Sequence, residues 1–185
     1  MKRINKLDIN DVTYWDAHIA EPEFGLRQEK YLELAGKGDK LLELGCGLSP
    51  FLDKARDNFK ECYGLDFSQE TLLKARQKYP KVTYIHGSVL KTDIIPDKSF
   101  DVCVAGELLE HLEDPLKLVE EMKRIARKKI VISSAHMEYN DPEHLWEFSK
   151  ESLLKLGKKY GKAEVEEIKS DWFPGRSYLF LTIDL

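Results

Sequence analysis

The chain has 185 residues, 42% hydrophobic and 34% charged, which is typical of a globular domain and excludes a disordered segment. The length indicates one domain with a sizeable core. The net charge of −4 does not predict a broad nucleic-acid-binding surface. No apolar run approaches a membrane span and no secretory leader follows Met1, so we expect a cytoplasmic protein without a membrane anchor. The three cysteines lack C-x-x-C spacing, and the sequence predicts neither a metal site nor a disulfide framework.

Residues 1–39 precede the first predicted strand and read as two helices, at 12–20 and 25–35. Their aromatic side chains either pack this segment onto the domain or cover a ligand site. We therefore expect an N-terminal helical segment, 1–39, in front of a main domain, 40–185.

The first strand, at 40–44, runs directly into a glycine turn at Gly45 and Gly47. Glycines there let the backbone turn sharply and let a ligand approach it closely. Pro50 suits the first turn of the following helix, whose free amides favour an anionic ligand group. Asp66 ends the second predicted strand, about 20 residues beyond the glycines, where an acid can hold ribose hydroxyls. The sequence therefore predicts a site for a nucleoside-containing cofactor.

The remaining elements follow in chain order, with helices expected at 51–58, 69–78, 115–129 and 150–160 and strands at 82–86, 101–105, 130–132, 163–168 and 178–183. A polar loop is expected at 133–148. The basic end of the third of these helices, 123–129, either compensates the helix dipole or contacts RNA. Five β-α units and a closing antiparallel hairpin predict an α/β fold with a doubly wound sheet.

The cofactor class follows from the glycine turn. A dinucleotide fingerprint would carry a third glycine where this chain has Pro50, which counts against NAD or FAD. The run Glu43–Gly47 instead resembles the first motif of class I S-adenosylmethionine-dependent methyltransferases. Phe100, Asp101 and the segment 106–112 also resemble that family, in the expected order. The resemblance implies S-adenosyl-L-methionine as cofactor and a Rossmann-like, mostly parallel seven-stranded sheet of order 3-2-1-4-5-7-6 with strand 7 antiparallel.

The resemblance also implies roles for individual residues. Asp66 would bind the ribose hydroxyls and Phe67 would pack on adenine. Ser88 stands where the family usually has an acid that binds the adenine amino group. A leading helix often covers the cofactor, so Tyr14 or Arg27 would meet its carboxylate. The full set of expected cofactor contacts is Tyr14, Arg27, Glu43, Gly45, Cys46, Gly47, Asp66, Phe67, Ser88, Val89 and Gly106.

No invariant catalytic motif is visible. The loop at 133–148 is expected to form one wall of the acceptor pocket. An acceptor that loses a proton needs a base, and histidine accepts one near neutral pH. His136 is the first candidate, ahead of His144, with His111 and Glu107 across the pocket. Each histidine has a structural alternative, in which it only packs its segment onto the domain.

The sequence therefore predicts methyl transfer, most simply to a small-molecule acceptor, because the chain has no inserted recognition domain. Three alternatives stay open. The chain could bind the cofactor and serve as a partner or scaffold, it could methylate RNA or protein, or it could be a nicotinamide-dependent oxidoreductase. The acceptor, the atom that is methylated and the oligomeric state are not determined by the sequence.

Overall fold

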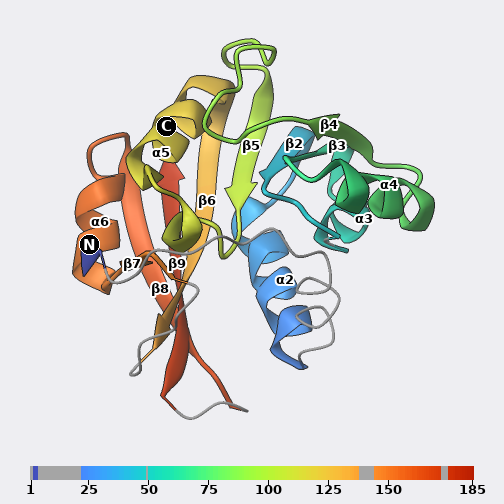
Figure 1. Ribbon diagram of the computed structural model, residues 1–185. Helices are drawn as coiled ribbons and strands as arrows, with labels where there is room; N and C mark the ends of the chain where they lie inside the picture. Colours follow the sequence, from blue (N-terminus) through green and yellow to red (C-terminus); the bar gives the residue numbers. More distant parts are fainter. Residues whose placement is uncertain (1, 4–21, 49, 138–143, 172–174) are drawn as a thin grey trace.

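The computed structural model describes residues 2–3, 22–48, 50–137, 144–171 and 175–185 (Figure 1). A short strand β1 (Lys2–Arg3) pairs antiparallel with β7 (Trp146–Glu147). No helix in these ranges is long and apolar enough to cross a membrane. The candidate site is positioned by the main sheet, by the segments that leave its edge and by helix α2 (Pro22–Ala35).

The main sheet has seven strands in the order β4-β3-β2-β5-β6-β9-β8. In chain order they are β2 (Gly38–Leu44), β3 (Phe59–Asp66), β4 (Thr83–His86), β5 (Phe100–Ala105), β6 (Ala126–Met137), β8 (Lys162–Lys169) and β9 (Arg176–Asp184). Numbered along the chain, this is the predicted order 3-2-1-4-5-7-6. Only β9 is antiparallel to its neighbours β6 and β8, as predicted for the seventh strand. The predicted fold class is confirmed.

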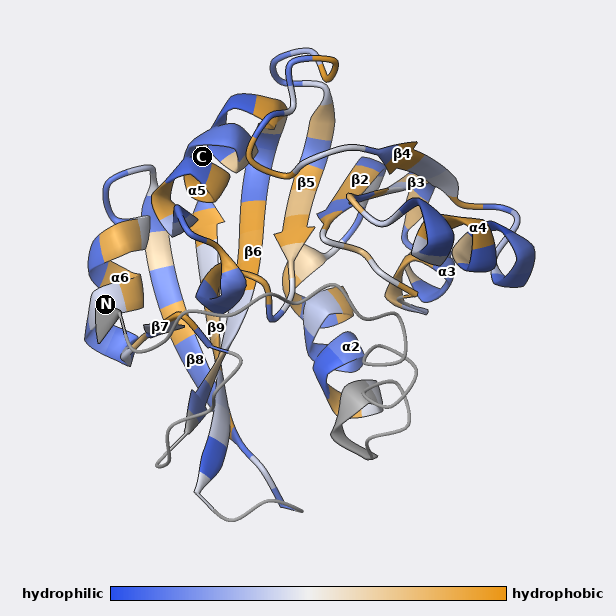
Figure 2. Ribbon diagram, viewed as in Figure 1, coloured by the Kyte–Doolittle hydropathy of each residue, from blue (hydrophilic) through white to orange (hydrophobic). Residues whose placement is uncertain are grey.

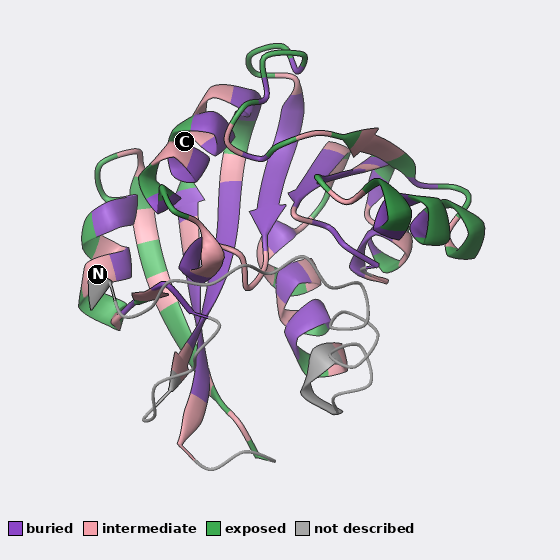
Figure 3. Ribbon diagram, in the orientation of Figure 1, coloured by how far each residue is buried: buried purple, intermediate pink, exposed green. Residues whose placement is uncertain are grey.

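Helices cover both faces of the sheet (Figure 1). They are α2 (Pro22–Ala35), α3 (Phe51–Ala55), α4 (Gln69–Lys78), the 3₁₀ helix η1 (Leu109–His111), α5 (Pro115–Ile125) and α6 (Lys150–Gly157). Along β5, Val102 and Val104 join the core under α2 and α3, whereas Cys103 and Ala105 join the core under α5 and α6. This alternation follows from the strand period of two. The central strands are therefore hydrophobic and buried on both faces (Figures 2 and 3).

One predicted boundary is wrong. The helix expected to reach residue 129 ends at Ile125, and β6 begins at Ala126. The strand then runs to Met137, so residues 133–137 belong to the sheet instead of a polar loop. Pairing with β5 on one side and β9 on the other accounts for this, since it outweighs the local preference of the sequence. The basic run at 123–129 is thus divided between a helix end and a strand. The other predicted boundaries agree within a few residues where the structure describes them, and the helix predicted at 12–20 lies outside the described residues.

The buried carboxylate of Asp101 joins three strands at the opposite end of the sheet from the candidate site. Its Oδ2 accepts hydrogen bonds from the amides of Asp39 (2.7 Å) and Lys40 (3.1 Å). Its Oδ1 pairs with Arg127 (3.1 Å) and Lys128 (3.0 Å). Burial alone would raise the pKa of Asp101, but the hydrogen bonds from Lys128 and the two amides outweigh burial and hold the pKa at about 2.

Asp101→Asn is expected to lower the free energy of unfolding by about 1–2 kcal/mol near neutral pH, because it removes a charged hydrogen-bond acceptor. The folded pKa of about 2 lies below the unfolded value of roughly 3.9. The stabilisation by Asp101 is therefore fully present above about pH 4 and is lost as the pH falls towards 2. Urea unfolding at several pH values measures this, with exposed Asp57→Asn as the control. A difference from wild type that stays constant down to low pH would contradict the assignment.

Candidate functional site

The turn after β2 depends on its glycines. Gly45 and Gly47 have positive φ angles, 71° and 50°. The amides of Gly45 and Cys46 both donate to the carbonyl of Leu65 at the end of β3, at 2.7 and 3.1 Å. A Cβ on Gly45 would lie 2.8 Å from a methyl carbon of Leu108. The loop is therefore held between β3 and the segment after β5. A side chain at Gly45 would need an unfavourable positive φ angle and would displace Leu108.

Asp66 connects this loop to the turn after β3. Its carboxylate is buried, with Oδ2 accepting from the amide of Gly47 (2.9 Å) and Oδ1 from the amide of Ser68 (2.8 Å). Burial raises the pKa of Asp66, and the backbone hydrogen bonds oppose that rise. Each carboxylate oxygen can accept a further hydrogen bond. The structure thus brings the two parts of the predicted cofactor motif into direct contact.

Two other residues of the motif are buried. Glu43 is 5% exposed near the end of β2. Cys46 packs its side chain into the core, where a Cβ on Gly64 would lie 2.6 Å from its Sγ. Burial raises the pKa of the Cys46 thiol well above its usual value. Cys46 can therefore offer a ligand its backbone but not its thiol.

The loops after β3 and β4 present the next predicted contacts. The ring of Phe67 is 55% exposed, and its carbonyl hydrogen-bonds the ring of His86 (3.0 Å). Ser88 is exposed, and its hydroxyl accepts from the amide of Leu90 (3.2 Å). Val89 is buried. An exposed aromatic ring and an exposed hydroxyl thus lie in successive loops at this edge of the sheet.

Helix α2 closes the site over the end of β5. Gly106 lies so close to Tyr31 that a Cβ there would collide with the phenol oxygen. Tyr31 is buried and hydrogen-bonds the hydroxyl of Ser133 on β6 at 2.5 Å. Burial raises the pKa of Tyr31 well above its usual value, so the phenol stays protonated. Sequence reasoning missed Tyr31 and Ser133. The one signal for Tyr31 was its position four residues after Arg27, which puts both on one helix face.

Glu107 follows Gly106 in a strained conformation, with a φ of 50°. Ser133 donates its hydroxyl to Glu107 Oε1 and accepts from the amide of Glu107 (3.1 Å). Arg27 lies 3.5 Å from Glu107 Oε2, with its guanidinium 4.7 Å from the centre of the Tyr178 ring. Burial, together with the charge of Glu110, raises the pKa of Glu107 to about 7. Arg27 is thus already engaged by Glu107 and Tyr178.

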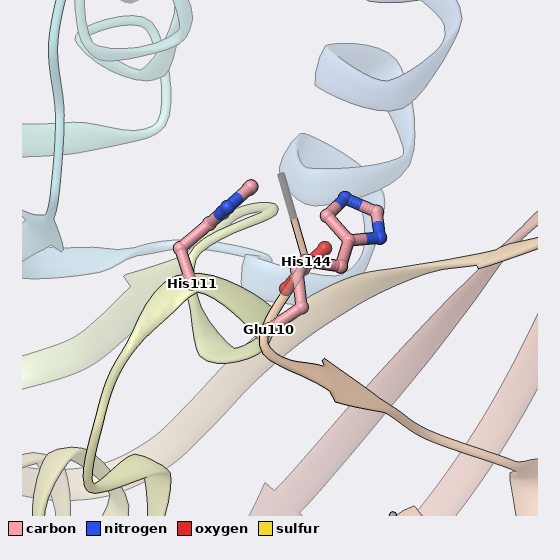
Figure 4. A group of neighbouring side chains, drawn as sticks. All are labelled: Glu110, His111 and His144. Atoms are coloured by element: carbon pink, nitrogen blue, oxygen red, sulfur yellow. The ribbon is translucent and has the colours of Figure 1, made fainter. Parts of the chain in front are cut away.

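The next turn brings together two of the candidate histidines. His111 from η1 and His144 from the segment before β7 have ring centres 4.9 Å apart, edge to face at 74°. The carboxylate of Glu110, which sequence reasoning missed, lies between the rings in the view of Figure 4. Glu110 is fully buried, and its Oε1 accepts from the amide of Ala135 (2.9 Å). Burial raises the pKa of Glu110 to about 7.

His136 lies in β6, paired with Ser177 of β9, and not in a loop as expected. It is half-buried, and its buried Nδ1 has no hydrogen-bond partner among the described residues. Tyr14, predicted to contact the cofactor, lies outside those residues. Residues 138–143, the middle of the predicted acceptor wall at 133–148, also lie outside them.

Comparison with known proteins supports one family. Residues 42–132 match the family model described as "Methyltransferase domain". A probable S-adenosylmethionine-dependent methyltransferase of Mycolicibacterium smegmatis is 34% identical over 113 residues, which is 59% of this chain and 44% of that protein. The demethylmenaquinone methyltransferase of Lysinibacillus sphaericus is 32% identical over 126 residues, 64% of this chain and 51% of that protein. The chain thus spans about half the length of these curated relatives.

A solved structure agrees with the observed fold. The N-methyltransferase NodS of Bradyrhizobium japonicum, in complex with S-adenosyl-L-homocysteine, superimposes with a TM-score of 0.74. The superposition covers 95% of this chain and 93% of NodS, at 18% sequence identity. At that identity the likeness shows a shared fold.

Proposed function

Because residues 42–132 match the methyltransferase-domain family model, we propose that the chain is a class I S-adenosylmethionine-dependent methyltransferase that transfers a methyl group from S-adenosyl-L-methionine to a small-molecule acceptor. The observation that carries this proposal is the contact between Asp66 and Gly47. It joins a loop whose two glycines have positive φ angles to a buried carboxylate that can still accept hydrogen bonds. A nucleoside with two ribose hydroxyls suits this combination.

The residues of the glycine loop and of the neighbouring turns bind different parts of the cofactor. Gly45 and Gly47 offer backbone to the methionyl part of the cofactor, and Glu43 supports their loop. Asp66 accepts hydrogen bonds from the ribose hydroxyls. The exposed ring of Phe67 packs on adenine. A neighbouring set, Ser88, Val89 and Gly106, completes the proposed contacts.

Arg27 has a different role in this proposal from the one first expected. The sequence suggested that it meets the cofactor carboxylate, but its guanidinium is paired with Glu107 and stacked on Tyr178. Arg27 would instead hold Glu107 in place and offset its charge. Glu107 follows Gly106 at the C-terminal end of the central strand, the edge at which α/β sheets bind ligands.

Methyl transfer needs positioning and, for many acceptors, removal of one proton. The bound cofactor supplies an electrophilic methyl group on its sulfonium. The protein holds the acceptor in line and excludes water. His136 is the first candidate base, because its Nδ1 has no hydrogen-bond partner in the described part of the chain. Glu107 is the second, with a pKa raised to about 7 by burial and by the charge of Glu110.

Two observations support a small-molecule acceptor. Several relatives are named demethylmenaquinone methyltransferases, after a small molecule. The net charge of −4 does not favour binding to a polyanion. The acceptor would therefore be a compact organic molecule carrying a hydroxyl, an amine or an activated carbon.

Calorimetric titration with S-adenosyl-L-homocysteine and, separately, with NAD tests the cofactor. We expect one equivalent of S-adenosyl-L-homocysteine to bind and NAD not to bind. Incubation with labelled S-adenosyl-L-methionine and a panel of quinol, phenol and amine acceptors then tests transfer. Preferential binding of NAD would overturn the proposal. Cofactor binding without transfer to any acceptor class, RNA and protein included, would favour a binding module without catalysis.

Ser88→Asp is expected to keep or tighten the binding of S-adenosyl-L-homocysteine. An aspartate can accept the hydrogen bond from the Leu90 amide that Ser88 now accepts, so the turn should persist. It also offers adenine a charged acceptor, which forms the stronger hydrogen bond. Calorimetry on both proteins measures the change. A loss of affinity of about tenfold or more, which is about 1.4 kcal/mol, would show that Ser88 does not face adenine.

A further inference from the structure

Three side chains that the proposed methyl transfer does not require converge after β5. Glu110 and His111 come from η1, and His144 comes from the segment that leads into β7 (Figure 4). One potential ligand atom from each lies within 4.8 Å of the others. A divalent ion holds imidazole nitrogens and carboxylate oxygens at about 2.0–2.2 Å. Small side-chain rotations would therefore bring the three atoms to the spacing that one ion requires.

Only one of the two carboxylate oxygens of Glu110 has a hydrogen-bond partner among the described residues. Its side chain is completely buried, and Oε1 accepts the amide of Ala135 at 2.9 Å. Its Oε2 is buried and has no hydrogen-bond partner in the described ranges. No lysine or arginine of those ranges lies within ion-pair distance of it. A buried carboxylate oxygen left in this state is costly, so it indicates a partner that protein atoms do not supply.

The backbone holds the two contributing segments together. The amide of Leu145 donates to the carbonyl of Glu110 at 2.8 Å. The indole of Trp146 donates to the carbonyl of Leu112 at 2.7 Å. The first bond joins the immediate neighbours of His144 and His111. The second joins Leu112, next to His111, to a residue two positions beyond His144. The cluster is therefore built on a fixed backbone, as a ligand site requires.

We propose that Glu110, His111 and His144 bind a divalent first-row transition-metal ion through one carboxylate oxygen and two imidazole nitrogens. Imidazole ligands select such ions over Mg²⁺ and Ca²⁺, which prefer oxygen. Three protein ligands leave a further coordination position for water or another oxygen ligand. The proposal does not depend on methyl transfer.

Metal binding to untagged protein, stripped with a chelator, tests this proposal. Co²⁺ is followed by visible absorption and Zn²⁺ by calorimetry. We expect one equivalent of either ion to bind. The three cysteines are buried and their thiol pKa values are raised, so they do not compete for the ion. The Co²⁺ spectrum should accordingly lack a thiolate charge-transfer band.

Three variants identify the ligands: Glu110→Gln, His111→Gln and His144→Gln. Each should weaken Co²⁺ binding by at least about 100-fold. Mutating a residue that only hydrogen-bonds a metal ligand already lowers metal affinity by about 10–100-fold, and these variants remove a ligand itself. His86→Gln, at the exposed end of β4, is the matched control and should bind Co²⁺ as wild type does. Near-wild-type melting temperatures and S-adenosyl-L-homocysteine affinity identify variants that are still folded.

The outcomes separate clearly. Loss of Co²⁺ binding in the folded cluster variants, but not in His86→Gln, supports the site. Absence of stoichiometric binding to wild type overturns it, as does binding that survives both His111→Gln and His144→Gln. Tighter binding of Mg²⁺ than of Co²⁺ would overturn the assigned class of ion. S-adenosyl-L-homocysteine binding is scored in the same samples, so failure of the metal proposal is distinguishable from failure of the proposed function.

Discussion

His136→Ala is expected to lower the turnover of the true acceptor by about 100-fold or more, the contribution of a positioned general base. Its affinity for S-adenosyl-L-homocysteine should stay within a few-fold of wild type. The cofactor affinity should hold because His136 lies on β6, which β5 separates from β2 and its glycine loop. His136 is the candidate base because its buried Nδ1 has no hydrogen-bond partner among the described residues. Steady-state kinetics and calorimetry measure the two quantities.

Ser177→Ala is the matched control, because Ser177 pairs with His136 across β6 and β9 but carries no basic group. A comparable loss of turnover in both variants would point to the packing of the strands. His136→Ala forfeits no hydrogen bond from Nδ1, so urea unfolding should show a stability close to wild type. If its turnover is unchanged, His136 is not the base, and Glu107→Gln tests the second candidate.

Asp66→Ala is expected to weaken the binding of S-adenosyl-L-homocysteine by about 1–3 kcal/mol, the cost of removing the partner of a charged hydrogen bond. That corresponds to about 5- to 150-fold in the dissociation constant. Two effects act together. The variant loses the acceptor for the ribose hydroxyls, and it releases the amides of Gly47 and Ser68 from the carboxylate.

Asp66→Asn and Glu70→Ala separate these effects. The asparagine retains one oxygen to accept a backbone amide, so its loss of affinity should lie between wild type and Asp66→Ala. Glu70 is an exposed acid in the first turn of α4, and its removal should leave the affinity unchanged. Unchanged affinity in folded Asp66→Ala would refute the ribose assignment.

The sequence by itself determined the order of the elements, the doubly wound α/β class and the residues of the cofactor motif, whereas the strand order was implied by the family resemblance. Strands read as apolar runs, and Gly45 and Gly47 mark a turn in which both residues have positive φ angles. The spacing from Gly47 to Asp66 then placed the two motif parts at the ends of neighbouring parallel strands. These features are local or depend only on element order, so a single sequence carries them.

Only the tertiary structure decided which side chains meet beyond that motif. Pairing with β5 and β9 extended β6 over residues that read as a polar loop, which moved His136 into the sheet. Tyr31, Glu107 and Ser133 meet because α2 crosses the ends of β5 and β6. Glu110 and His111 meet His144 because one backbone hydrogen bond and one from the indole of Trp146 join segments that are far apart in the chain. No spacing predicts such contacts, because they depend on how separate elements pack and not on the period of any one of them.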